Sequence, residues 1–399
     1  MNKSLLDRLF DPSTGNSGVI DLLRTVGILQ VVFFHVIHGI VRFAPTEDIP
    51  AFIDRLPGLF NFGWQAYGVD VIFVVSAFLL TWSMLREINE TGKISYRRFF
   101  ISRLSRILPV YYLALFLFAL AQGNSWWEIL TSALFIGYIA GNTNVIPVGW
   151  SMEVMILYYI ALPFIVTGLQ KVGRPILWLA ILVTAAALWR FLFLIGLPED
   201  PSQLFLTMID TKNSSYGGFE LYFRPWFRLP AFLMGTLMAY PLAQGLAPRT
   251  YWTPAIALSL IIAIIWLPVQ DRDSFAYQMA SPIVWAIYWA LAPVIFARAF
   301  GFLMIWALQR GTEKPWNIPW IWSPFSKNIF SVYLFHMPFL AVAAIAVFRT
   351  TDAAALGAAH WAEVVVTFVL TSAIALAFAW PVTRYIERPI QNWLLRFSQ

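Results

Sequence analysis

The chain has 399 residues, of which 59% are hydrophobic and only 12% are charged, and its mean hydropathy is +0.69. Soluble globular domains usually carry about 25% charged residues, so this composition excludes a water-soluble fold and indicates an integral membrane protein. The absence of cysteine excludes disulfides, thiolate metal sites and a thioester on the enzyme. The formal net charge of +6 implies no nucleic-acid partner, because basic residues gather at the cytoplasmic ends of membrane helices.

Long apolar runs predict an all-α, polytopic transmembrane helix bundle. A run of about 20 residues crosses a hydrocarbon core of roughly 30 Å, and the chain has about ten such runs. Two shorter apolar pieces, 126–139 and 300–308, are expected to be interfacial or re-entrant. The expected spans lie near residues 18–41, 68–85, 105–121, 151–168, 175–196, 228–246, 252–268, 280–297, 328–348 and 362–383.

The distribution of basic residues orients the predicted bundle. With the N- and C-termini cytoplasmic, most of the 27 lysines and arginines fall on the inner side, as the positive-inside rule requires. We find no internal repeat or linker, so residues 1–399 are expected to form a single membrane domain without an appended soluble domain. The longest outer loop, about 197–227, could cover an acceptor site, although a solvated loop without function explains its acidic residues equally well.

The first predicted span carries two residues that are costly in a membrane, Arg24 and His35. They are eleven residues apart, which places them on one helix face with a rise of about 16 Å. Arg24 is then close to the cytoplasmic interface, where a snorkelling arginine is the alternative interpretation. His35 lies deeper, and imidazole is suited to proton transfer. A structural histidine is the competing explanation.

Four arginines precede the third predicted span on its inner side: Arg97, Arg98, Arg103 and Arg106. Guanidinium groups bind phosphates bidentately, so this stretch favours a phosphate-bearing, nucleotide-like ligand from the cytosol. Contact with anionic lipids and a role in topology are the alternative, but lysine would serve them as well.

Polar residues in other spans complete the candidate site. Trp150 and Glu153 open the fourth span at its outer interface, and Tyr333 and His336 lie about ten residues inside the ninth. A carboxylate can orient a histidine or bind an acceptor hydroxyl, whereas an aromatic belt alone explains the tryptophan. Ser76 in the second span could bind substrate or simply satisfy itself on a preceding carbonyl.

The sequence resembles the acyltransferase-3 family of membrane proteins over nearly its whole length. The resemblance rests on an R-x10-H pair formed by Arg24 and His35, and on further motifs in the order typical of the family. Two positions depart from the pattern: Ala77 replaces a usual glycine, and Met155 replaces a glutamate for which Glu153 could substitute. The further motifs are "GVDVIFVVSAFLLT", "RLSRILPVYY", "WSMEVMILYY", "YLFHMP" and "RYIERPI".

The resemblance implies a membrane-embedded O-acyltransferase of the bacterial inner (plasma) membrane. It would move an acetyl or other short acyl group from cytosolic acyl-CoA to a hydroxyl of a carbohydrate, lipid-linked sugar or small molecule, without a metal. His35 would be the general base or carry the acyl group transiently, and Arg24 would position the donor or stabilise an oxyanion, with Glu153 assisting. The resemblance further implies a CoA site at Arg97, Arg98, Arg103 and Arg106, and an acceptor site at Ser76, Trp150, Tyr159, Tyr333 and His336.

Two other classes of function fit parts of the pattern. A transporter or flippase of a lipid-linked or anionic substrate also lines its path with charged residues, but the two similar halves common in transporters are absent from the sequence. A membrane sensor that binds acyl-CoA or lipid would need the arginine cluster. It would give no reason for pairing Arg24 with His35.

Overall fold

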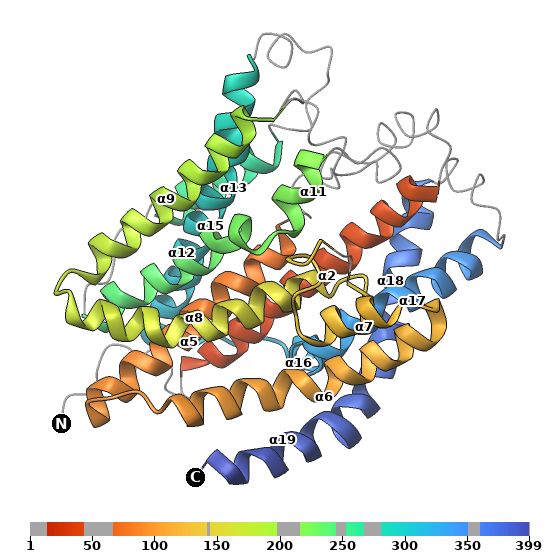
Figure 1. Ribbon diagram of the computed structural model, residues 1–399, viewed down its shortest axis with the longest axis horizontal. Helices are drawn as coiled ribbons and strands as arrows, with labels where there is room; N and C mark the ends of the chain where they lie inside the picture. Colours follow the sequence, from red (N-terminus) through yellow and green to blue (C-terminus); the bar gives the residue numbers. More distant parts are fainter. Residues whose placement is uncertain are drawn as a thin grey trace.

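A computed structural model describes residues 14–43, 67–141, 144–197, 216–244, 253–266, 281–349 and 360–398. All regular elements in these ranges are helices, which confirms the predicted all-α class. Long helices lie side by side in a bundle (Figure 1). This architecture suits a lipid solvent, because a helix satisfies its backbone hydrogen bonds within its own segment.

The longer helices in chain order are α2 (Asn16–Phe43), α5 (Gly68–Thr91), α6 (Tyr96–Gln122), α8 (Trp150–Lys171), α9 (Pro175–Ile195), α12 (Pro225–Ala243), α13 (Thr253–Trp266), α15 (Pro282–Glu313), α17 (Ile329–Phe348) and α18 (Trp361–Val382). The shorter ones are α7 (Trp126–Ala133), α11 (Tyr216–Phe223), α16 (Ser323–Lys327) and α19 (Arg388–Leu395), with single turns at Trp320–Trp322 and Arg396–Ser398. A π-helical turn, Thr383–Glu387, joins α18 to α19.

Eight helices of the described residues are long and apolar enough to cross a membrane: α2, α5, α6, α8, α9, α15, α17, and α18 with its continuation through Leu395. They correspond to eight of the expected spans. The expected span at 228–246 forms α12, which contains Arg228 and several prolines and is buried within the bundle along most of its length. A helix packed against protein needs less hydropathy than one packed against lipid.

One expectation about apolar segments needs correction, and another lies partly outside the described residues. The segment expected at 252–268 forms the 14-residue α13, and the residues on both sides of this helix lie outside the described ranges. The piece at 300–308 is not separate but part of α15, a continuous helix of 32 residues. The expected span 280–297 ends just before the charged Arg298. In the structure the Arg298 guanidinium lies 5.2 Å from the centroid of the Phe302 ring, and the helix continues without interruption.

The other short apolar piece, 126–139, contains the eight-residue α7, which cannot cross a bilayer. Ser125 and Glu128 form a capping box at its start, in which each side chain bonds the backbone N–H of the other residue. Hydrogen bonds from Ser125 also lower the pKa of the Glu128 carboxyl. The sequence-based expectation that this piece is not a span is therefore confirmed by its length.

The bundle is centred on the contact between α5 and α12. Phe73 stacks on Phe232 with ring centroids 4.3 Å apart, and the Thr81 hydroxyl donates to Thr236 at 3.3 Å. The helices approach closely because Gly235 of α12 faces the backbone of α5. Small residues allow this approach in membrane bundles, where dispersion and hydrogen bonds must hold helices together.

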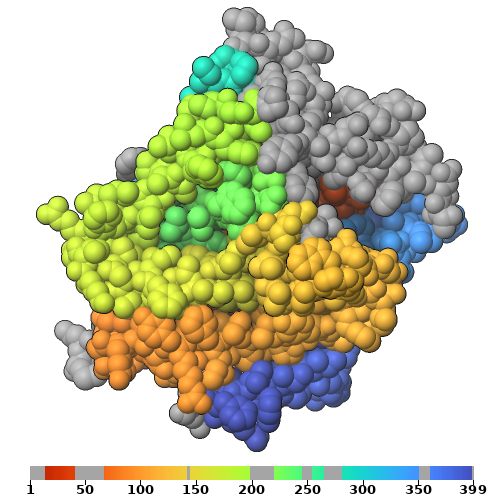
Figure 2. All heavy atoms as spheres, viewed as in Figure 1, coloured from red at the N-terminus to blue at the C-terminus, as the bar shows by residue number. Residues whose placement is uncertain are grey.

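Helix α2 crosses α5 where two glycines meet, Gly27 of α2 and Gly68 of α5. A Cβ atom on Gly68 would lie 2.9 Å from the Gly27 carbonyl oxygen. Helices α17 and α18 also pack on α2. On the face in Figure 2, atoms of α6, α8 and α9 form much of the visible surface, and little of α2 can be seen. Helix α2 thus packs against α5, α17 and α18, and its polar side chains can meet groups of the protein.

We predict that Gly235→Ala destabilises the protein, because the added Cβ would lie 2.5 Å from the Val74 carbonyl oxygen and 2.8 Å from Ala77 Cβ. Overpacking of this kind costs about 1–3 kcal/mol, and thermal unfolding in detergent should show a lower Tm. Gly168→Ala in α8 is the matched control, because nothing lies within 4 Å of its added Cβ. Equal Tm values for the two variants would show that α5 and α12 do not pack this closely.

Candidate active site

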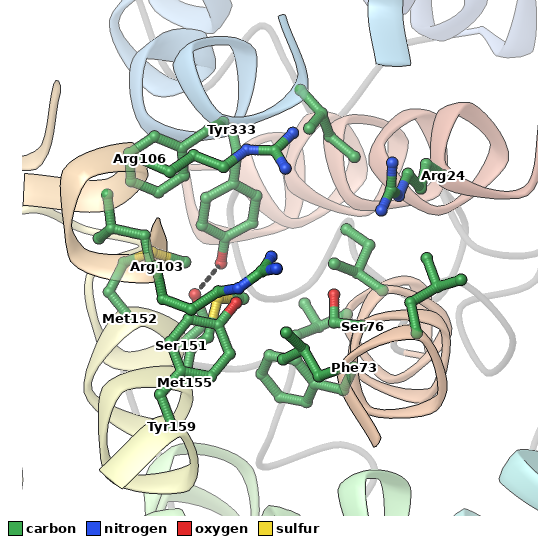
Figure 3. Close-up of a pocket in the computed structure, with 17 residues that line it drawn as sticks. Arg24, Phe73, Ser76, Arg103, Arg106, Ser151, Met152, Met155, Tyr159 and Tyr333 are labelled. Atoms are coloured by element: carbon green, nitrogen blue, oxygen red, sulfur yellow. Dashed lines mark hydrogen bonds between the residues drawn. The ribbon is translucent and has the colours of Figure 1, made fainter. Parts of the chain in front are cut away.

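Three arginines line one pocket. Arg24 comes from α2, and Arg103 and Arg106 come from adjacent turns of α6. Their guanidinium groups point into the same space (Figure 3). Within the described residues, no carboxylate oxygen lies within 4.0 Å of any of them, although Asp21 interacts at longer range with Arg24 and Glu387 with Arg106. Arg103 Nε is buried without a hydrogen-bond partner. Since like charges repel and buried charges require partners, an anionic ligand would stabilise this arrangement.

The rest of the pocket combines a few polar groups with an apolar wall. Ser76 of α5 and Tyr159 of α8 face the arginines, and the side chains of Phe73, Met152 and Met155 extend the lining (Figure 3). About 930 Å³ of space in the pocket, including its open part, is free of atoms. Ligand sites are mostly apolar with a few polar groups, and the pocket has this character.

Another part of the pocket wall is closed by a bond between two helices. The hydroxyl groups of Ser151 in α8 and Tyr333 in α17 lie 2.7 Å apart, and both residues line the pocket. Both hydroxyl groups also lie within hydrogen-bonding distance of the Val148 carbonyl oxygen, which can accept from either. Tyr333, expected from the sequence, is thus held in place by Ser151, which the sequence did not single out.

Two histidines pair one helical turn beyond Tyr333. His336 Nε2 lies 3.1 Å from His35 Nδ1, so α17 and α2 meet here. Each ring also contacts a carbonyl of its own helix: His35 Nδ1 lies 2.8 Å from the Val31 oxygen, and His336 Nδ1 lies 2.7 Å from the Tyr333 oxygen. His336 is fully buried, whereas His35 is partly exposed. Residues 301 positions apart in the sequence therefore form one polar unit.

The pocket and the histidine pair are linked by two shared helices. Arg24 and His35 are on α2, separated by a rise of about 16 Å, and Tyr333 and His336 are on α17. Arg24 and Tyr333 line the pocket, whereas the two histidines lie further along the same helices.

Glu153 anchors an irregular segment between α7 and α8. Its Oε1 accepts from Asn144 Nδ2 at 2.8 Å, and its Oε2 accepts from the Tyr138 backbone N–H at 3.0 Å. The same Asn144 amide donates to the Tyr111 hydroxyl at 3.2 Å. Glu153 is fully buried, and no hydrogen bond to His35 is found in the described part of the chain. These contacts give Glu153 a positioning function, and its proposed catalytic role remains a prediction.

Asp70 and Arg228 form a buried ion pair that sequence reasoning did not identify. Arg228 Nη1 lies 3.0 Å from Asp70 Oδ2, which ties α12 to the start of α5. The guanidinium also lies 4.4 Å from the Tyr222 ring centroid and 5.2 Å from that of Trp150. Nearby, Arg190 donates to the Phe227 and Trp289 carbonyls at 2.6 and 2.9 Å. Asp70 and Arg228 lie near the starts of the expected spans 68–85 and 228–246, which enter the membrane from the same side, and this was the available signal.

Several candidates from the sequence lie outside the pocket. Arg97 and Arg98 are exposed near the start of α6 and do not line it, unlike Arg103 and Arg106. Trp150 is buried under Arg228 and takes no part in the lining. Ser76, Tyr159 and Tyr333 do line the pocket. Most of the outer loop expected at 197–227 lies outside the described residues. No group of three potential metal ligands occurs in the ranges that the structure covers.

Comparison with known proteins identifies the family. The model of the acyltransferase domain family matches residues 18–384, which include the pocket and the histidine pair. The chain belongs to this family. As a family member with several membrane-spanning helices, it is a multi-pass membrane acyltransferase.

Relatives of this acyltransferase are found in distant organisms. The regulator of hypoxia-inducible factor 1 from Caenorhabditis elegans is 22% identical over 385 residues, covering 84% of this chain and 73% of the worm protein. A protein of Acidianus two-tailed virus, provisionally named an acetyltransferase, is 26% identical over 266 residues, covering 66% of this chain and 69% of the viral one.

A Staphylococcus aureus protein (strain COL), provisionally named an O-acetyltransferase, is 29% identical over 93 residues. These residues make up 23% of this acyltransferase and 11% of the staphylococcal protein. No solved structure matches the chain.

We predict that Glu153→Ala lowers the stability of the acyltransferase. Without the carboxylate, the Tyr138 N–H and the Asn144 amide lose their acceptor, and each buried unsatisfied group costs about 1–3 kcal/mol. Glu90→Ala, which removes only an exposed pair with Arg86, is the control and should change stability by about 0.5 kcal/mol or less. Thermal unfolding in detergent measures both. A Glu153→Ala protein with the parent's Tm but no activity would instead favour a catalytic carboxylate.

Proposed function

We propose that this acyltransferase moves an acetyl or other short acyl group from acyl-CoA to the hydroxyl group of an acceptor, with His35 as general base. The observation that carries the proposal is the set of three arginines without an ion pair in one pocket, of which Arg24 lies on the same helix as His35 of the histidine pair. The acceptors that fit are a carbohydrate, a lipid-linked sugar or a small molecule.

The arginine pocket supports a donor that carries phosphates. Arg24, Arg103 and Arg106 can donate several hydrogen bonds each, and planar guanidinium groups match phosphate oxygens in pairs. Arg103 Nε, buried and without a partner, is one such free donor. The apolar wall of Phe73, Met152 and Met155 suits the less polar arm of the donor. This division of polarity fits acyl-CoA, whose phosphates and acyl thioester lie at opposite ends.

Distance assigns Arg24 to the donor's phosphates in this proposal. Arg24 lines the pocket beside Arg103 and Arg106, whereas His35 lies about 16 Å further along α2 and does not line it. Of the two roles expected for Arg24, binding of the donor is the one that the geometry supports.

His35 Nε2 is the nitrogen that would take part in the reaction. The Val31 carbonyl can only accept, so it favours the tautomer with hydrogen on Nδ1 and a lone pair on Nε2. In direct transfer, Nε2 takes the hydroxyl proton while the new O–C bond forms and the C–S bond breaks. The proton then passes to the leaving CoA thiolate. In the relay version, Nε2 first attacks the carbonyl carbon and the C–S bond breaks to release the CoA thiolate. The acceptor oxygen then attacks the acyl carbon, the bond between that carbon and Nε2 breaks, and the hydroxyl proton passes to the thiolate.

The proposed orientation places the arginines toward the cytosol and the acceptor on the extracytoplasmic side. The excess of basic residues assigned to the inner side supports this orientation through the positive-inside rule. In this orientation, the CoA donor would enter from the cytosol and the acceptor would lie on the side of the cell envelope. For a bacterial protein, the membrane would be the inner (plasma) membrane, and the termini would be cytoplasmic.

The donor assignment predicts a contrast between arginines of the same helix. Arg103→Ala and Arg106→Ala should each weaken acetyl-CoA binding about tenfold or more, because a charge-assisted hydrogen bond contributes about 1.5–3 kcal/mol. Arg97→Ala and Arg98→Ala, outside the pocket, should change the Kd less than about twofold, as exposed charges contribute little. Titration with radiolabelled acetyl-CoA in detergent gives the four values. Equal losses at all four positions would indicate a general electrostatic effect and refute this pocket as the donor site.

The proposed role of His35 predicts that its replacement slows the chemical step without weakening the binding of acetyl-CoA. His35→Ala should keep the parent's affinity for acetyl-CoA but lose about 10²–10⁴ in the rate of acyl transfer or CoA-ester hydrolysis, the usual contribution of a general base. His360→Ala, at the exposed start of α18, is the control. Release of radiolabel from acetyl-CoA measures the rate. Normal turnover by a folded His35→Ala protein would exclude both the direct and the relay mechanism.

A further inference from the structure

The hydrogen bonds of His35 and His336 define the state of both rings. Each Nδ1 faces a backbone carbonyl, at 2.8 Å in His35 and 2.7 Å in His336. A carbonyl oxygen only accepts, so the hydrogen of each neutral ring belongs on Nδ1 and the lone pair on Nε2. Two carbonyls, one from α2 and one from α17, thereby select the same tautomer in both histidines.

This assignment makes the contact between the rings a matched hydrogen bond. His336 Nε2 carries a lone pair and lies 3.1 Å from His35 Nδ1, which carries a hydrogen. The His35 N–H is then shared between the Val31 carbonyl and His336. The only ring nitrogen of the pair with no hydrogen bond to the described residues is His35 Nε2. The pair thus presents one lone pair to a substrate.

We propose that His336 is a positioning residue that orients the His35 ring and stabilises it when it becomes protonated. This inference rests on the proposed function of His35 as the base, and it replaces the substrate-binding role expected for His336. His336 itself is fully buried and would not touch the acceptor. It would act on the reaction only through its Nε2 contact with His35.

The stabilisation follows from where charge develops. When His35 Nε2 takes the acceptor's proton, the ring becomes an imidazolium, and its Nδ1–H becomes a stronger donor. No carboxylate bonds to His35 within the described residues, so the groups that receive this hydrogen bond are His336 Nε2 and the Val31 oxygen. Both are neutral acceptors in a site of low polarity, where hydrogen bonds to a charged group are strongest. The proton stays on His35 until the CoA thiolate takes it.

The position of His336 Nε2, which accepts the hydrogen bond from His35, determines which variants can test the proposal. The side-chain oxygen of glutamine can occupy the place of imidazole Nε2, whereas the shorter asparagine matches only Nδ1. His336→Gln can therefore accept from His35, and His336→Asn cannot. His336→Leu removes the polar groups but keeps a similar volume. If His336 served only to fill the core, leucine would be tolerated best.

We expect His336→Leu and His336→Asn to lower kcat by about 10- to 100-fold, as loss of partners that orient a reactive histidine does elsewhere. The Kd for acetyl-CoA should remain unchanged, and His336→Gln should recover most of the rate. Thermal unfolding in detergent identifies any variant that does not fold. Equal rates for the glutamine and leucine variants, or a parent-like kcat for leucine, would overturn the proposal.

A second measurement determines the tautomers of the two histidines and does not depend on catalytic turnover. With only four histidines in the chain, ¹⁵N-histidine labelling gives few imidazole signals, and variants at His35 and His336 assign them. Hydrogen on Nδ1 of both rings in the parent supports the pair as described, and hydrogen on Nε2 of either ring refutes it. If the parent shows this pattern but cleaves no acyl-CoA, the proposed function fails while the pair stands. If the parent protein cleaves acyl-CoA and the His336→Leu variant keeps the parent's kcat, only the role of His336 fails.

Discussion

An unpaired charge is costly inside a helix bundle in lipid, and the polar interior of this protein follows from that constraint. Asp70 and Arg228 neutralise each other, and Arg190 is satisfied largely by two carbonyl groups. Arg24, Arg103 and Arg106 form no ion pair within 4.0 Å among the described residues. The contrast separates charges that are paired within the fold from charges that the proposed function assigns to a ligand.

Helix α2 connects the two halves of the candidate site because it packs against both α5 and α17. Its crossing with α5 at Gly27 and Gly68 brings Arg24 into the pocket that Ser76 also lines. Further along the same helix, α17 supplies the partner of His35. A bulkier residue at Gly68 would separate α2 from α5 and thereby move the arginine pocket relative to the histidines. Close packing far from the reacting atoms thus supports the geometry of the site.

Local spacing predicted part of this site and could not predict the rest. The eleven-residue interval between Arg24 and His35, and the three-residue interval between Arg103 and Arg106, are properties of one helix and can be read from sequence. Arg97 and Arg98 were grouped with them, yet the first turn of α6 is exposed. The pairs His35–His336 and Asp70–Arg228 join residues 301 and 158 positions apart, so only the tertiary arrangement reveals them. Glu153 was recognisable as an unusual carboxylate, but its partners belong to an irregular segment that has no periodic signal.

The interval on α2 also acts as a ruler for the donor. Under the proposed function, a donor held by its phosphates near Arg24 would have to extend along about 16 Å of helix rise to bring its reactive carbon to His35. Molecular length would then select among donors that share the same charged head. A truncated analogue that keeps the phosphates would occupy the pocket and block it without reacting, so competitive inhibitors of this enzyme could be designed by shortening the arm rather than by changing the head.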